Sequence, residues 1–114
     1  MKASAPSTGL ALSGAILYWA ARLTGSRVTS GFRTPEENSS VGGKPDSMHL
    51  NGQAIDIAAD ANRVARTLLG FLSAKGGYDL AGTAPHYHYS ADDATILKAV
   101  GVVLLGISLI RVIL

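Results

Sequence analysis

The three histidines of this chain lie in two short segments, one of which also carries an aspartate. His49 and Asp56 are seven positions apart, and His86 and His88 follow about thirty positions later. Two neutral imidazoles and one carboxylate can supply three ligands to a zinc ion and leave its fourth position open, as a catalytic site requires. The chain has no cysteine, so any metal must be held by nitrogen and oxygen atoms. The pattern therefore indicates a hydrolytic zinc site.

Length and charge limit what else the chain can do. Its 114 residues leave room for one domain, and a bound metal would help to stabilise so small a core. The net charge is only +2, and no run of Lys or Arg indicates nucleic-acid binding. Only 16% of the residues are charged and the mean hydropathy is positive, which is unusual for a soluble domain. This composition points to contact with lipid.

The elements that must position the histidines can be predicted from local patterns. Residues 1–8 are polar and predict an extended arm. Residues 9–23 predict a core helix, with a signal sequence as the alternative. Residues 27–30 predict a short strand. A helix is expected to begin at Pro35, with Thr34 as its N-terminal cap.

The middle of the chain predicts further strands around one helix. Residues 53–57 predict a strand with Asp56 on one face, and residues 78–80 and 87–89 predict two more strands. Residues 62–73 predict an amphipathic helix, because apolar residues recur there at helical spacing. The side chains expected on the buried face of this helix are those of Val64, Leu68, Leu69 and Leu72.

Residues 94–114 are almost entirely aliphatic and are interrupted by Lys98, Ser108 and Arg111. A helix of this length spans about 30 Å, the thickness of the hydrocarbon core of a bilayer. It has no polar face, and a domain of about ninety residues could not enclose it. We therefore predict a membrane-spanning anchor, with Lys98 and Arg111 reaching the two interfaces. A buried helix, or one packed against copies of itself in an assembly, is the alternative.

Two motifs resemble those of a known peptidase family. The first is Ser-Gly-aromatic-Arg at residues 30–33. The second is Ser-x-His-x-x-Gly-x-Ala-x-Asp, matched by Ser47, His49, Gly52, Ala54 and Asp56. The sequence thus resembles the M15 peptidases over about residues 10–90. These are D-alanyl-D-alanine carboxypeptidases and L-alanyl-D-glutamate endopeptidases of bacteria and phages, related to lysostaphin and hedgehog-like zinc domains. The resemblance implies an α+β fold for residues 9–92, with a short antiparallel sheet and flanking helices.

The resemblance also implies roles for the candidate ligands. His49 and Asp56 would bind Zn²⁺. His86 and His88 share a face if they lie on a strand, because side chains alternate there. By resemblance, His88 would be the third ligand, and His86 would transfer protons or stabilise the oxyanion. The reverse assignment of these two histidines stays open.

Arg33 and Ser47 are the candidate substrate-binding residues. By resemblance, Arg33 reaches into the cleft, where its planar guanidinium would bind a peptide carboxylate. The alternative is a surface ion pair with Glu36 or Glu37. Ser47 would orient a ligand through a hydrogen bond, or it would cap the loop in which it lies.

One position departs from the family pattern. Most M15 enzymes carry an Asp or Glu three residues before the last zinc ligand, where it acts as the general base. Here Pro85 precedes His88 and Thr83 precedes His86 at that spacing, and Asp79 lacks it. Either His86 carries the proton, since imidazole titrates near neutral pH, or the domain only binds cell-wall peptide.

Together these features predict a membrane-anchored zinc peptidase that hydrolyses stem or cross-link peptides of peptidoglycan. A phage product is expected, placed in the membrane of a virion with virion proteins as partners and used at entry. A bacterial inner-membrane enzyme with a periplasmic domain is the alternative location. The alternative function is an inactive structural protein of the virion or membrane that binds peptidoglycan.

Overall fold

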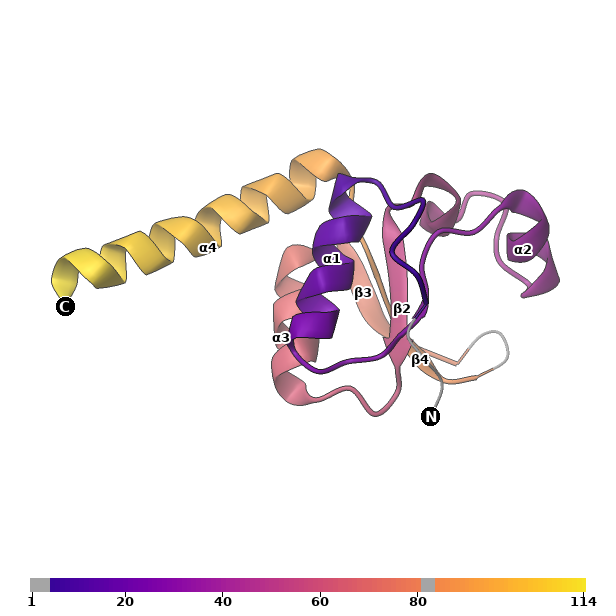
Figure 1. Ribbon diagram of the computed structural model, residues 1–114, viewed down its shortest axis with the longest axis horizontal. Helices are drawn as coiled ribbons and strands as arrows, with labels where there is room; N and C mark the ends of the chain where they lie inside the picture. The colour runs from indigo at the N-terminus through magenta and orange to yellow at the C-terminus, as the bar shows by residue number, and fades with distance from the viewer. Residues whose placement is uncertain (1–4, 81–83) are drawn as a thin grey trace.

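The computed structural model describes residues 5–80 and 84–114 (Figure 1). The chain forms an α+β domain around a four-stranded antiparallel sheet in the order β1-β2-β4-β3. The strands are β1 (Val28–Ser30), β2 (Ala54–Ala58), β3 (Lys75–Asp79) and β4 (His86–Ser90). The helices are α1 (Leu12–Leu23), α2 (Pro35–Ser40), the 3-10 helix η1 (Met48–Asn51), α3 (Arg63–Leu72) and α4 (Asp93–Ile113). The predicted fold class is confirmed.

The central strands have one apolar face and one polar face. Side chains on a strand point alternately to its two sides. The side chains that join the core under α1 and α3 are Ile55, Ile57, Tyr87 and Tyr89. The side chains that point to the other face are Asp56, His86 and His88. The register pairs Asp56 with His88, so alternation alone places the candidate chemistry on the side of the sheet away from these two helices.

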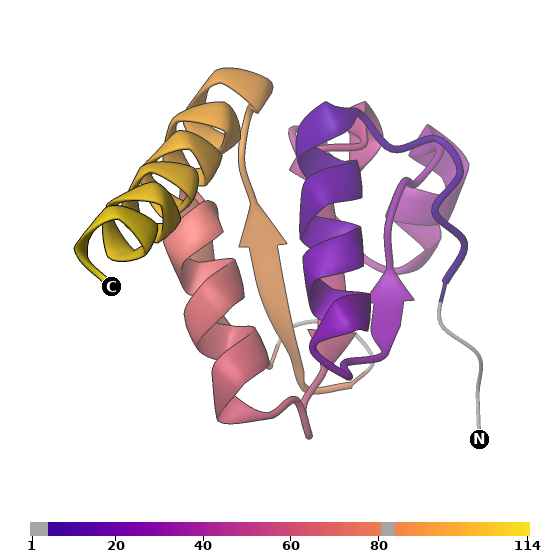
Figure 2. The same ribbon diagram turned by 60° about the vertical axis from the view of Figure 1, so that its left-hand side comes forward.

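The core helix predicted at the N-terminal end is confirmed as α1. Leu17 and Ala21 are fully buried in the core, and Figure 2 shows α1 and α3 side by side over the sheet. The start of α1 is capped from a distance, because Asp93 Oδ1 accepts a 2.8 Å hydrogen bond from the backbone N–H of Ser13. This bond satisfies a free N–H at the positive end of the helix dipole and fixes the first turn of α4 against the domain.

Two local predictions differ from the structure. The strand expected at 78–80 begins earlier, at Lys75, and includes Gly76. A Cβ atom at Gly76 would lie 2.5 Å from the ring of Tyr89, so glycine at this position makes room for that ring. In helix α3, Leu69 and Leu72 are buried and Leu68 packs against the core, as predicted. Val64 is 69% exposed instead, and Ala65 is buried in its place.

The ends of the chain also bear on the predictions. Of the arm expected at residues 1–8, residues 1–4 lie outside the described residues. Ala5 donates its N–H to the carbonyl of Val28 at 2.7 Å, so the described part of the arm runs against β1. At the other end, α4 projects from the domain (Figure 1), and in the described residues it is the one helix long and apolar enough to cross a membrane.

Gly52 has a conformation and a packing environment that exclude any side chain. Its φ is +68°, and a Cβ atom would lie 2.5 Å from the carbonyl oxygen of Gly9 and 2.7 Å from the backbone nitrogen of Ala11. We expect Gly52→Ala to destabilise the fold by more than the 1–2 kcal/mol, roughly, that a left-handed backbone costs an ordinary residue, since the backbone of residues 9–11 must also move. Thermal unfolding of the full chain in detergent measures the loss.

Gly42 provides the matched control for this substitution. Its φ is +73°, but nothing lies within 4 Å of the position that a Cβ atom would take. Gly42→Ala should therefore show the backbone cost alone. Equal losses in the two variants would contradict the packing explanation for Gly52.

Candidate metal centre

Three predicted metal ligands meet on the polar face of the sheet. One donor atom from each of His49, Asp56 and His88 lies within 4.8 Å of the other two. Asp56 comes from β2, His88 comes from the paired position on β4, and His49 comes from η1. Residues that are far apart in the sequence thus form one compact cluster.

The imidazole of His49 is held by the backbone around it. Ser47 Oγ accepts a 3.2 Å hydrogen bond from the backbone N–H of His49 and caps η1. Besides substrate binding, the sequence left two roles open for Ser47, which were to orient a metal ligand or to cap its loop. The observed hydrogen bond is the cap. The carbonyl of His49 accepts a 3.1 Å bond from the N–H of Arg33. Its ring Nδ1 lies 2.7 Å from the carbonyl oxygen of Gly31, so the ring has a defined orientation.

The carboxylate of Asp56 is shared between the imidazoles and Arg33. Oδ1 lies 3.2 Å from His49 Nε2 and 2.9 Å from His88 Nδ1, and Oδ2 lies 2.9 Å from Arg33 Nη2. Burial alone would raise the pKa of Asp56, but hydrogen bonds from His49 and His88 and the charges of His49 and His86 outweigh burial and hold this pKa well below its usual range. Asp56 is therefore a carboxylate and a competent metal ligand.

The contacts of His49 fit a metal ion. A carbonyl oxygen only accepts hydrogen bonds, so Nδ1 carries the ring proton, and a neutral imidazole then has a lone pair on Nε2. That lone pair faces the carboxylate oxygen of Asp56, and both side chains are at most 5% exposed. A nitrogen and a carboxylate oxygen that face each other at 3.2 Å are bridged by a cation, which is either a proton on Nε2, as in the hydrogen bond that lowers the pKa of Asp56, or a bound metal ion. A carbonyl that holds the second nitrogen of a ligand histidine is a usual partner in zinc sites.

His86 lies beside this cluster. Its Nδ1 is 2.9 Å from the carbonyl oxygen of Ala84, which orients Nε2 toward two carboxylates. Nε2 is 3.7 Å from Asp56 Oδ2 and 3.7 Å from Asp79 Oδ2. The two histidines of the pair therefore share a face, as predicted, but differ in position. The compact cluster includes His88, and His86 borders it.

Asp79 is a site residue that the sequence did not place. It lies on β3 directly opposite His86 in the β3–β4 register, and its carboxylate is near the ring of His86. The family spacing misses it, because the contact runs across two strands rather than along one. If residues 75–90 are read as a β-hairpin, Asp79 and His86 fall opposite each other on its two strands.

The three nitrogen atoms of the Arg33 guanidinium each contact another side chain. Nη2 pairs with Asp56, and Nε donates to Ser30 Oγ at 3.0 Å and Nη1 to Asn38 Oδ1 at 3.3 Å. Asn38, which the sequence analysis did not single out, is buried at the end of this network. The guanidinium thus orients the carboxylate of Asp56. Its role as a substrate anchor stays a prediction.

Comparison with known proteins agrees with this arrangement. The family model for peptidase M15 matches residues 18–90, from the middle of α1 to the end of β4. The matched segment contains every candidate site residue and excludes α4. Comparisons with curated proteins and with solved structures find no significant match. Because the matching segment covers more than half of the chain, the protein belongs to the peptidase M15 family.

Proposed function

We propose that this M15 peptidase is a zinc-dependent enzyme that hydrolyses stem or cross-link peptides of peptidoglycan and is anchored in a membrane by α4. The family supports a peptidase that acts on peptidoglycan. The observation that carries zinc dependence is the convergence of His49 Nε2, Asp56 Oδ1 and His88 Nδ1, with Nδ1 of His49 already committed to a carbonyl.

The residues around the three donors divide the work of amide hydrolysis. Zinc, when bound, lowers the pKa of a water molecule and polarises the scissile carbonyl. Arg33 holds Oδ2 of Asp56 and leaves Oδ1 directed at the imidazoles. His86, with Nδ1 fixed by Ala84, presents Nε2 as the group that takes a proton from the attacking water and returns it to the leaving amine. Arg33 and Ser47 are proposed to border the bound peptide.

The membrane anchor is supported by the composition and exposure of α4. Its length and apolar surface fit a bilayer, and most of its side chains beyond Val103 are exposed. We propose a phage protein of the virion membrane, with virion proteins as partners, and a bacterial inner-membrane enzyme as the alternative. The alternative function, an inactive protein that binds peptidoglycan, is motivated by the absent family carboxylate.

Mass spectrometry of digested peptidoglycan tests this proposal. The purified full chain in detergent, loaded with zinc, is expected to release soluble muropeptides, and the new peptide ends identify the bond that is cut. A preparation stripped with a chelator should release none and should recover activity when zinc is restored. A protein that retains zinc, binds peptidoglycan and releases nothing would instead support the binding function.

Asp79 is expected to position the ring of His86 in the active enzyme. Removal of its charge in Asp79→Asn should lower kcat by about tenfold, within the range seen when a residue that orients a site histidine is lost. KM and zinc content should stay unchanged, since Asp79 lies outside the three donors. Steady-state hydrolysis of a stem peptide and metal analysis measure these quantities.

Asp60→Asn is the control for this variant. Asp60 is exposed in the loop after β2, so the same chemical change there should leave kcat unaltered. If Asp79→Asn retains full activity, or loses zinc, then Asp79 does not act through His86 as proposed.

A further inference from the structure

The first half of α4 is not free to enter a membrane alone. Ile96 is fully buried in the core, and Ala99 and Val100 pack against it. Val103 lines a groove against α3. Beyond Val103 the helix continues to Ile113, which gives about 15 Å at 1.5 Å per residue. The hydrocarbon core is about twice as thick, so this free part alone does not cross it, and anchoring by α4 brings the domain into contact with the membrane unless the domain releases the helix.

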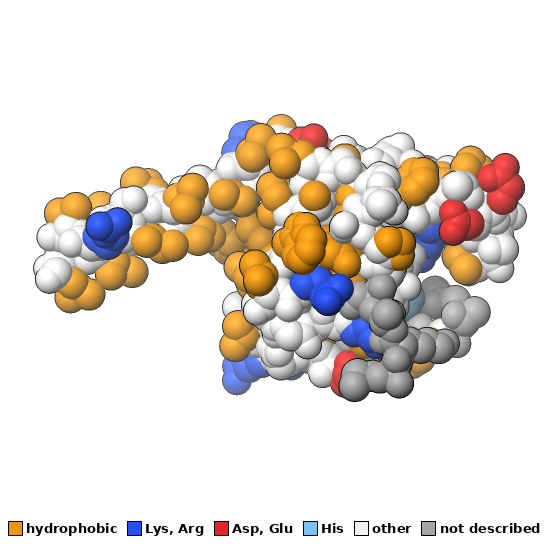
Figure 3. All heavy atoms as spheres, viewed as in Figure 1, with side chains coloured by type: hydrophobic (Ala, Val, Ile, Leu, Met, Phe, Trp, Pro, Cys, Tyr) orange, Lys and Arg blue, Asp and Glu red, His pale blue; other side chains and the backbone are white. Residues whose placement is uncertain are grey.

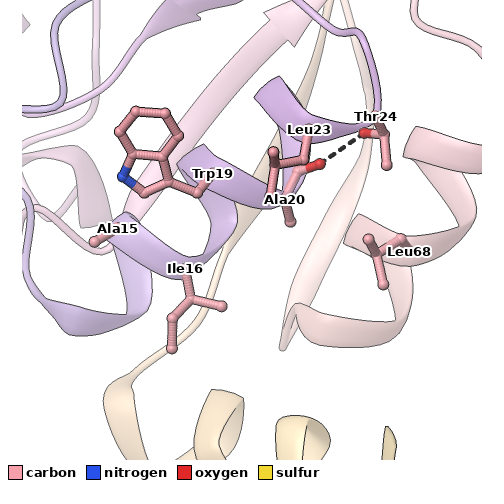
Figure 4. A pocket seen from close by; sticks show the side chains of 7 residues that line it. All are labelled: Ala15, Ile16, Trp19, Ala20, Leu23, Thr24 and Leu68. Atoms are coloured by element: carbon pink, nitrogen blue, oxygen red, sulfur yellow. Dashed lines mark hydrogen bonds between the residues drawn. The ribbon is translucent and has the colours of Figure 1, made fainter.

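The surface next to this part of α4 is strongly apolar. It is formed by α1 and α3, and its most exposed large side chains are Trp19, Leu23, Val64 and Phe71. Figure 4 shows the groove between α1 and α3, which is lined by apolar side chains of both helices. A second groove lies between α3 and α4. Leu68 lines both grooves, so the apolar surface is continuous from α1 to α4. We call it the α1–α3 face.

Charge on these two helices has one sign. Their sequences contain Arg22, Arg63 and Arg66, all exposed, and no Asp or Glu. Acidic side chains lie at the end of the molecule where α2 lies and at the start of α4 (Figure 3). An apolar surface bordered by arginines suits a bilayer with anionic headgroups, because arginine stems can lie along the apolar surface while the guanidinium reaches the phosphates.

We propose that the domain lies directly on the bilayer, with the α1–α3 face in contact with anionic headgroups and the upper acyl chains. The inference rests on the proposed anchoring by α4. Aromatic side chains such as Trp19 are favoured at this depth. Because Asp56 and the histidines point to the other face of the sheet, the metal centre then faces away from the membrane, toward the cell wall.

Trp19 is the only tryptophan in the chain and reports on this contact directly. The full chain is reconstituted into vesicles of phosphatidylcholine and phosphatidylglycerol, and flotation measures anchoring. In these vesicles we expect Trp19 emission to shift to the blue, to be quenched by lipids brominated near the headgroup end of their chains, and to be protected from iodide. Vesicles without phosphatidylglycerol should give weaker lipid quenching.

The double variant Val64→Ser with Phe71→Ser tests the surface itself. Both side chains are more than half exposed, so the fold should persist while lipid quenching of Trp19 falls. Val41→Ser, an exposed valine beside α2, is the control and should leave quenching unchanged.

Each other outcome overturns the proposal in a recognisable way. Protein that floats with vesicles while Trp19 stays open to iodide shows a domain held away from the bilayer. Trp19 protected from iodide but not quenched by lipid shows that a second copy covers the α1–α3 face. Protein that does not float removes the proposed anchor and this inference together, while peptidase activity in detergent still tests the catalytic proposal.

Discussion

His88→Ala is expected to remove zinc from the protein and to abolish its peptidase activity. His88 Nδ1 lies 2.9 Å from Asp56 Oδ1, inside the compact cluster. Loss of a residue that only supports a ligand typically costs about 10–100-fold in metal affinity, so loss of a ligand should weaken zinc binding at least as much. The side chain is 31% exposed, and its removal leaves the core packing of β4 intact. Metal analysis after dialysis and zinc titration measure the effect.

His86→Ala is the matched control for metal binding. It removes the same ring two positions along β4, but from the border of the cluster, and should retain zinc. Circular dichroism must show both variants folded. Zinc retained by His88→Ala and lost from His86→Ala would contradict the assignment and establish His86 as the third ligand.

Peptidase activity should fall by about 10²–10⁴-fold in His86→Gln, the range contributed by a positioned acid or base. Glutamine keeps a hydrogen-bonding side chain at this position but cannot carry a proton between water and the leaving amine. Zinc content should match that of the unmodified protein, because His86 lies outside the three donors. The initial rate of muropeptide release measures the loss.

Tyr78→Phe serves as the control for His86→Gln. Tyr78 lies next to Asp79 on β3, and its ring packs against Tyr87, so removal of its hydroxyl should leave the rate unchanged. Full activity in His86→Gln would show that a group other than His86 moves the proton. Besides Asp56, the carboxylate of Asp79 lies beside His86 in the described residues and would be the next candidate.

The local elements were predictable because their signals act over a few residues. Thr34 caps α2 and Pro35 begins it, as a cap followed by proline indicates. Alternation along β2 puts Asp56 on the face opposite Ile55 and Ile57, and the same rule separates His86 and His88 from Tyr87 and Tyr89 on β4. Predictions failed where two elements meet. Helical spacing fits Ala65 and Val64 about equally well with the leucines of α3, and the packing of α3 in the fold buries Ala65 and exposes Val64.

The sequence by itself indicated the family, the α+β class and the candidate donors, because the motif residues and the strand alternation are local properties of the chain. Only the tertiary structure decided how those donors are used. Strand register brings His88 into the cluster and Asp79 to His86, a loop brings Arg33 onto Asp56, and packing on the core holds Ile96 of the apolar helix in the domain. These contacts join residues far apart in the sequence, so their geometry exists only once the chain has folded.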